Sequence, residues 1–156
     1  MKLASGFAPV DQMLKREIAV SLGTDGAASN NNLSILKEMS LAALIAKGFT
    51  EDPKALPAHS VVEMATMGGA RAVMLEGKIG SLEAGKKADI QLIDTNKPHY
   101  HPKEDPLVHL VYSGYSSDVD TVIINGKIVM QGRELTTIDL AQVYKEIEKI
   151  VNRIRN

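Results

Sequence analysis

Residues 19–32, AVSLGTDGAASNNN, are the part of the sequence that says most about the fold. An apolar run over residues 18–22, with two β-branched members, stops at Gly23-Thr24-Asp25-Gly26. A short continuous apolar run of this kind is typical of a buried strand. Small polar residues and then a helical pattern follow, whereas an Asp-Gly hairpin turn would return at once into a partner strand. We therefore predict a strand over residues 18–22 with Asp25 at its C-terminal end.

Asp25 is the first candidate for a chemical role. Side chains at the C-terminal ends of parallel strands face the ligand side of helix-covered sheets and barrels. A carboxylate between two glycines, which let backbone and ligand approach closely, suits a metal ligand or a proton acceptor. A plain Asp-Gly turn is the alternative, and the residues alone favour neither. Ser29 and Asn30 are candidates for binding a polar substrate, although a helix cap with a polar lead-in explains each of them more simply.

The first half of the chain is predicted to be α/β. A short amphipathic helix is expected over residues 11–17, before the predicted strand. A long helix over residues 33–47 follows, with Asn32 as its N-cap and Gly48 at its end. Residues 58–75 predict two short helices that are separated at Gly68-Gly69.

The pattern changes near Gly77, where a small β part begins. Glycine-rich turns lead into a strand over residues 88–93. The apolar runs on either side of Asn125-Gly126 predict a hairpin, because both central residues of its turn take positive φ. Residues 138–154 form a last amphipathic helix, with apolar side chains along one stripe.

Composition excludes several classes of protein. The chain has 156 residues, a formal net charge of −1 and no cysteine. It therefore lacks disulfides and thiolate metal sites, and it has no excess of cations for nucleic acid or anionic lipid. No apolar run approaches the roughly 20 residues of a membrane span, and the N-terminal residues do not read as a signal peptide. We expect no nucleic-acid or membrane partner, and a cytoplasmic location.

His99 and His101 have the His-x-His spacing of a metal pair. They lie among three prolines, just after a predicted strand ends, in the segment TNKPHYHPKEDP. A loop so rich in proline does not hold alternate residues on one rigid face. We therefore expect a surface loop here rather than a metal site.

Several segments together resemble the C-terminal part of the metal-dependent amidohydrolase superfamily. The most specific combination is GTDGAASNN at residues 23–31 followed by GSLEAGKKAD at residues 80–89. KLASGFAPV, ALPAHSVVEMATMGGARAV and DVDTVIINGKIVMQGREL match in the same order, so nearly the whole chain is covered. The chain is most similar to the branch that deaminates 5'-methylthioadenosine and S-adenosylhomocysteine, with its s-triazine chlorohydrolase relatives.

The resemblance implies a fold and a role for Asp25. The fold would be a C-terminal fragment of a (β/α)8 TIM-type barrel, with part of a small composite β-sandwich and a C-terminal helix. The corresponding segments are residues 1–77, 78–135 and 136–156. Asp25 would be a metal ligand and would accept the proton of the attacking water. The metal would be zinc, with iron left open, and the substrate a small molecule with a purine-like or s-triazine ring.

The sequence departs from the family pattern in one large respect. Members of the family carry metal-binding histidines and a carboxylate acid/base upstream of KLASG, and none of these is present here. We therefore expect a fragment that is inactive alone, since catalytic zinc needs about three protein ligands. The alternative is a non-catalytic α/β module that acts as a self-associating or structural subunit, because an incomplete barrel exposes apolar strand edges. Deamination and dechlorination are not distinguished.

Overall fold

The computed structural model describes residues 3–155, which fall into two units. The first unit comprises the chain up to Lys86 together with Thr95–Asp118, and the second comprises Lys87–Asp94 and the chain from Val119 onward. Lys2, the first residue of the KLASGFAPV segment, lies outside the described residues. Each unit is described separately.

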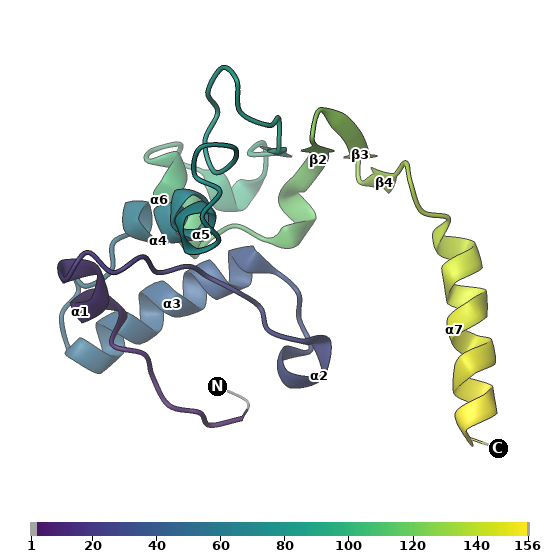
Figure 1. The fold of residues 1–156 in the computed structure, drawn as a ribbon, viewed down its shortest axis with the longest axis horizontal. Helices are drawn as coiled ribbons and strands as arrows, with labels where there is room; N and C mark the ends of the chain where they lie inside the picture. The colour runs from purple at the N-terminus through teal and green to yellow at the C-terminus, as the bar shows by residue number, and fades with distance from the viewer. Residues whose placement is uncertain (1–2, 156) are drawn as a thin grey trace. The chain divides into compact units, whose positions relative to one another are not determined.

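The first unit is built from helices. Three of them, α3, α4 and α6, enclose its core, which contains Met39 and Ala43 of α3, Val61 of α4 and Val111 of α6. Figure 1 shows the long helix α3 with the shorter helices of this unit around it. The elements of the unit are α1 (Val10–Lys15), α2 (Ala27–Asn30), α3 (Ile35–Thr50), α4 (Ala58–Ala65), α5 (Met67–Ala72), η1 (Pro98–Tyr100), α6 (Pro106–Tyr112) and η2 (Ser116–Asp118).

Helix α3 begins two residues later than the N-cap prediction placed it. Ser34 is its N-cap, and the Ser34 hydroxyl accepts a hydrogen bond from the Lys37 amide at 3.3 Å. Asn32 instead accepts a hydrogen bond from the Ser34 amide, in the turn that leads into the helix. The prediction of Asn32 as the cap was therefore wrong, because both residue types cap helices well and the turn decides between them.

The predicted strand over residues 18–22 is not formed. A strand exists only when a neighbouring strand takes up its backbone hydrogen bonds, and the described part of the chain places none beside this segment. Val20 and Leu22 nevertheless pack against the helical core. Only Val20 and Leu22 are half-buried, since Ile18 is 45% exposed, so the prediction of a buried strand is wrong for the described chain.

The break between α4 and α5 lies at Thr66 rather than at Gly68-Gly69. The Thr66 hydroxyl donates to the Val62 carbonyl oxygen at 2.8 Å, and its backbone leaves helical geometry with φ −123° and ψ −93°. Gly68 has a different reason to be glycine. A Cβ atom at this position would lie 2.5 Å from the carbonyl oxygen of Val20, so α5 approaches the 18–22 segment only because Gly68 lacks a side chain.

Gly68→Ala is expected to lower the free energy of unfolding by about 1–3 kcal/mol, because overpacking forces the backbone of the 18–22 segment to shift. Gly48→Ala is the matched control. Gly48 lies inside α3, where a new Cβ would meet nothing within 4 Å, and alanine there is expected to be neutral or to stabilise by up to about 1 kcal/mol. Urea denaturation of the two variants checks this, and equal effects would contradict the close approach.

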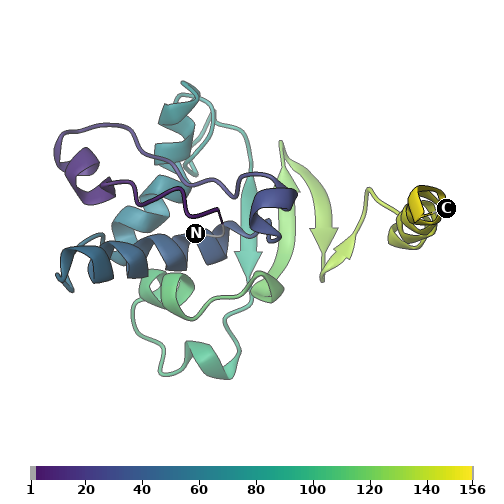
Figure 2. The same cartoon turned by 90° about the horizontal axis from the view of Figure 1, so that it is seen from below.

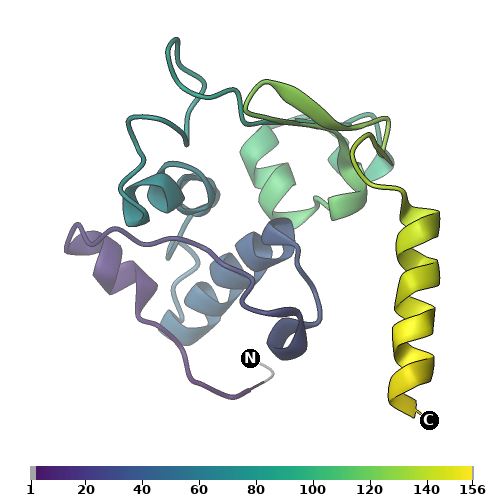
Figure 3. The same ribbon diagram turned by 45° about the vertical axis from the view of Figure 1, so that its right-hand side comes forward.

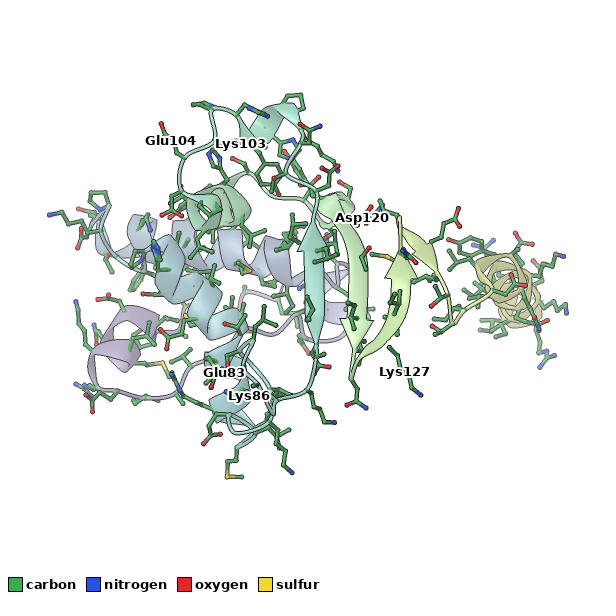
Figure 4. The ribbon with its side chains drawn as sticks, turned by 90° about the horizontal axis from the view of Figure 1, so that it is seen from above. Glu83, Lys86, Lys103, Glu104, Asp120 and Lys127 are labelled. Carbon is green, nitrogen blue, oxygen red and sulfur yellow. The ribbon has the colours of Figure 1, made fainter. Side chains whose placement is uncertain are left out.

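The second unit contains an antiparallel sheet with the strand order β1-β2-β3-β4. The strands are β1 (Ile90–Ile93), β2 (Val119–Ile124), β3 (Lys127–Gln131) and β4 (Glu134–Leu135). The predicted hairpin is confirmed: Asn125 and Gly126 join β2 to β3 with φ values of 50° and 77°. Figure 2 shows the strands side by side, and Figure 4 shows Asp120 and Lys127 towards opposite ends of them.

Helix α7 (Leu140–Arg155) confirms the predicted C-terminal helix. Figure 3 shows it as one uninterrupted helix. None of its described side chains is buried. Among residues 3–155, no helix has both the length and the apolar character that a membrane span requires.

Candidate functional site

Asp25 lies in the loop before α2, in the left-handed backbone region with φ 58°. Its two carboxylate oxygens have different partners. The Gly26 amide donates to Oδ1 at 2.7 Å, and the Ser29 hydroxyl lies 2.7 Å from Oδ2. The carboxylate is thereby held in one orientation while its remaining lone pairs stay exposed.

These hydrogen bonds also set the protonation state of Asp25. The Ser29 hydroxyl, and then the Gly26 amide, lower the pKa of the Asp25 carboxyl below its ordinary value of 3.8. The side chain is therefore a carboxylate at neutral pH. A carboxylate that is already ionised can bind a cation or accept a proton, which is what either proposed role requires.

Asn30 anchors the same loop from the other side. Its amide nitrogen donates to the Thr24 carbonyl oxygen at 2.7 Å and to Glu38 Oε1 at 2.8 Å. Glu38 lies in the first turn of α3, so this pair fixes the Thr24-Asp25 turn to the start of the long helix. The structure therefore gives Asn30 a positioning role, in addition to any contact with a substrate.

A cavity of about 510 Å³ lies beside this loop, within the first unit. Asp25, Ser29 and Asn30 all line it, together with the segment around Phe7 and one face of α3. The three predicted site residues are thus brought together at one cavity. Glu38 lines the same cavity and was not predicted, because nothing local in the sequence links it to Asn30 eight residues earlier.

The residues at the cavity fit one ligand position rather than a complete metal site. Within residues 3–155, no group of three or more His, Cys, Asp or Glu side chains could hold a metal ion. Of the three carboxylates that line the cavity, Asp11 is paired with Lys15 and Glu38 accepts from Asn30, whereas Asp25 is exposed and offers oxygens of the type that zinc accepts. A zinc ion here would need further ligands beyond those that the described chain brings together.

His99 and His101 have different surroundings. His99 lies in η1, with its Nε2 atom 3.0 Å from Asp118 Oδ2, whereas His101 is exposed in the loop that follows. His101 is exposed, as expected for a surface loop, but Tyr100 in η1 is buried. Asp118 also accepts hydrogen bonds from Lys97 at 2.9 Å and from the Tyr115 amide at 2.8 Å.

Comparison with known proteins places these features in a family context. The model of the amidohydrolase family matches residues 1–129. A 5-methylthioadenosine/S-adenosylhomocysteine deaminase from Caldanaerobacter subterraneus subsp. tengcongensis is 56% identical over 149 residues, covering 96% of this chain and 34% of the relative. The enzyme of the same name from Moorella thermoacetica is 52% identical over 153 residues, covering 98% and 36%.

Solved structures of deaminases and chlorohydrolases are also similar to this chain. An adenosine deaminase from Xanthomonas campestris with bound zinc matches with a TM-score of 0.95 at 38% identity, over 99% of this chain and 35% of that protein. A zinc complex of the atrazine chlorohydrolase from Arthrobacter aurescens matches with a TM-score of 0.86 at 28% identity, over 94% and 32%. The chain spans about a third of the length of the curated relatives that it matches.

Proposed function

The chain belongs to the amidohydrolase family, and from this premise we propose that it forms one wall of the active site of a metal-dependent deaminase. The reaction would be hydrolysis of a C–N bond on a purine-like ring, with release of ammonia. The observation that carries the proposal is the Asp25 carboxylate, ionised at neutral pH and held by Ser29 and Gly26 at the cavity.

Two further points bear on the substrate class and the metal. The deaminases from Caldanaerobacter and Moorella are 56% and 52% identical to this chain and the adenosine deaminase is 38% identical, whereas the chlorohydrolase is 28% identical, which favours C–N over C–Cl hydrolysis. Zinc is present in the solved structures of both a deaminase and a chlorohydrolase. We therefore propose zinc as the metal.

In this proposal each residue of the loop has a separate task. When bound, zinc would supply a Lewis acid that lowers the pKa of a water molecule. Asp25 would be one ligand and would accept the proton of the attacking water at its exposed oxygen. Ser29 would keep Asp25 ionised and oriented, and Asn30 would hold the turn against Glu38 of α3.

We also propose that the chain is the C-terminal part of a (β/α)8 barrel enzyme. The support is the coverage of about a third of each relative, together with the TM-score of 0.95 to the zinc-containing deaminase. In that arrangement residues 18–22 would pair with barrel strands from the rest of the enzyme, and the other zinc ligands would come from there. Residues 1–77, 78–135 and 136–156 would be the barrel, sandwich and helix segments.

The proposal is tested by a chimera. The corresponding third of the Caldanaerobacter deaminase is replaced by this chain, and ammonia release from 5-methylthioadenosine is measured alongside zinc content. The chimera is expected to bind zinc and to deaminate, because 56% identity over 149 residues preserves most contacts. The isolated chain with added zinc is expected to show no turnover.

The unmodified Caldanaerobacter enzyme serves as the positive control. A folded chimera that binds zinc but releases no ammonia would contradict the proposed role of this chain. Turnover by the isolated chain that disappears in Asp25→Ala would contradict the need for ligands from elsewhere.

A further inference from the structure

Helix α7 carries an apolar seam that no other part of its unit buries. Val143, Ile147, Ile150 and Ile154 are 38%, 50%, 54% and 79% exposed. They recur at alternating steps of four, three and four residues, which is the a/d spacing of a coiled coil. The seam is therefore suited to pair with one other helix.

The two borders of the seam differ in chemistry. Glu146 and Arg153 occupy the g positions on one side, and both are exposed. Tyr144 and Val151 occupy the e positions on the other side, so this border is apolar. Residues at the e and g positions set the orientation of a coiled coil, because they face each other across it.

An antiparallel pairing of α7 with a second α7 gives each of these seam and border residues a partner of matching chemistry. When Ile147 packs against Ile150 of the second copy, Val143 packs against Ile154, and two-fold symmetry repeats both layers. In the same register Glu146 faces Arg153 of the second copy, twice. Tyr144 faces Val151 of the second copy on the other border, also twice, so charges meet opposite charges and apolar groups meet apolar groups.

A parallel pairing lacks this complementarity. Each g position would then face the e position five residues further along the second copy. Glu146 would face Val151, and Asp139 would face Tyr144. No oppositely charged pair would form across the seam, so charge complementarity selects the antiparallel arrangement.

We propose that α7 is a self-association surface, on which two copies of this chain pair as an antiparallel two-helix coiled coil. The two-fold axis would pass between Glu148 and Lys149. This inference does not depend on the proposed enzymatic function, and its test measures association alone. It concerns a surface other than the barrel edges that the sequence suggested for self-association.

The first test is a charge-reversal cycle measured by sedimentation equilibrium. Glu146→Arg and Arg153→Glu each replace two attractive pairs by two repulsive ones, and each is expected to raise the dimer Kd about tenfold. The double variant restores opposite charges and is expected to return the Kd to within about threefold of the original value. Lys145→Glu at the f position, away from the seam, is the matched control and is expected to leave the Kd unchanged.

The second test measures orientation directly. The chain has no cysteine, so a spin label on Ala141→Cys or Glu148→Cys is unique in each copy. Both residues are b positions, with the same direction relative to the seam. The antiparallel dimer predicts a separation along the helix axis of only about 1.5 Å for the pair of labels at 148, but about 22 Å for the pair at 141. A parallel dimer predicts equal label distances at the two positions.

Ile147→Lys identifies the surface, because lysine keeps the helix but places a charge in two layers of the seam. It is expected to abolish the dimer, with the helical circular dichroism of the monomer retained. A chain that stays monomeric at about 100 μM, well above a micromolar Kd, overturns the proposal. So does a dimer that persists in Ile147→Lys, a dimer insensitive to the charge reversals, or equal label distances.

Discussion

Asp25→Asn in the chimera is expected to lower kcat/KM by about 10²- to 10⁴-fold, the range that a positioned proton acceptor contributes. Asparagine has nearly the same shape, but it cannot accept the proton of the attacking water. The Gly26 amide would still donate to the side-chain carbonyl oxygen, and the side-chain amide would donate to the Ser29 hydroxyl oxygen, so the turn is expected to keep its conformation. Ammonia release and zinc content, measured on the same samples, check the prediction.

Asp11→Asn is the control for this variant. Asp11 lines the same cavity, but its carboxylate is paired with Lys15 at 2.6 Å on its own helix. It is therefore expected to change kcat/KM by less than about threefold, since exposed pairs of this kind contribute little. Equal losses in the two variants would show that the cavity needs negative charge in general, which would contradict a specific role for Asp25.

The sequence was most informative where the physical cause of a structure is local. The positive φ values at Asn125-Gly126 require only those two residues, and the hairpin follows from them. The loop around Asp25 is similar, because Ser29 and the Gly26 amide reach the carboxylate within four residues. The contacts that hold the Asp25 carboxylate are therefore local in the sequence, whereas the role of Asp25 stays a prediction.

The predictions from sequence failed where a structural feature depends on contact between separate segments of the chain. Residues 18–22 have the composition of a buried strand, but a strand also needs a neighbour, and composition does not say whether one is present. The link between Asn30 and Glu38 has no signature that separates it from any other exposed Asn and Glu. The missing information in both cases is which segments come together.

Asp118 is the clearest feature that sequence reasoning missed, and it carries the second large prediction. Its side chain is only 1% exposed, yet it is a carboxylate that accepts hydrogen bonds from Lys97, the Tyr115 amide and Tyr100. These join the η1 loop to the turn of η2, about 20 residues away. Asp118→Ala is expected to lower the free energy of unfolding by about 3–5 kcal/mol, because it removes a buried acceptor of several hydrogen bonds and leaves the buried Tyr100 hydroxyl without it.

Urea denaturation at pH 7 measures this loss, with Glu104→Gln as the control. Glu104 is an exposed carboxylate in the loop between η1 and α6 (Figure 4), and its change is expected to stay within about 0.5 kcal/mol. A loss in Asp118→Ala no larger than that of the control would contradict a structural role for the buried carboxylate.

The effect of Asp118→Ala is also expected to depend on pH. Burial alone would raise the pKa of Asp118, but hydrogen bonds from Lys97, the Tyr115 amide, His99 and Tyr100 hold it well below the ordinary value of 3.8. A lowered pKa in the folded chain means that the ionised carboxylate stabilises the fold fully above about pH 4, and less as the pH falls towards the folded-state pKa. The difference in unfolding free energy between the original chain and Asp118→Ala should therefore be largest near neutral pH and shrink below pH 4. A difference that grows on acidification would contradict the ionised state of Asp118 in the fold.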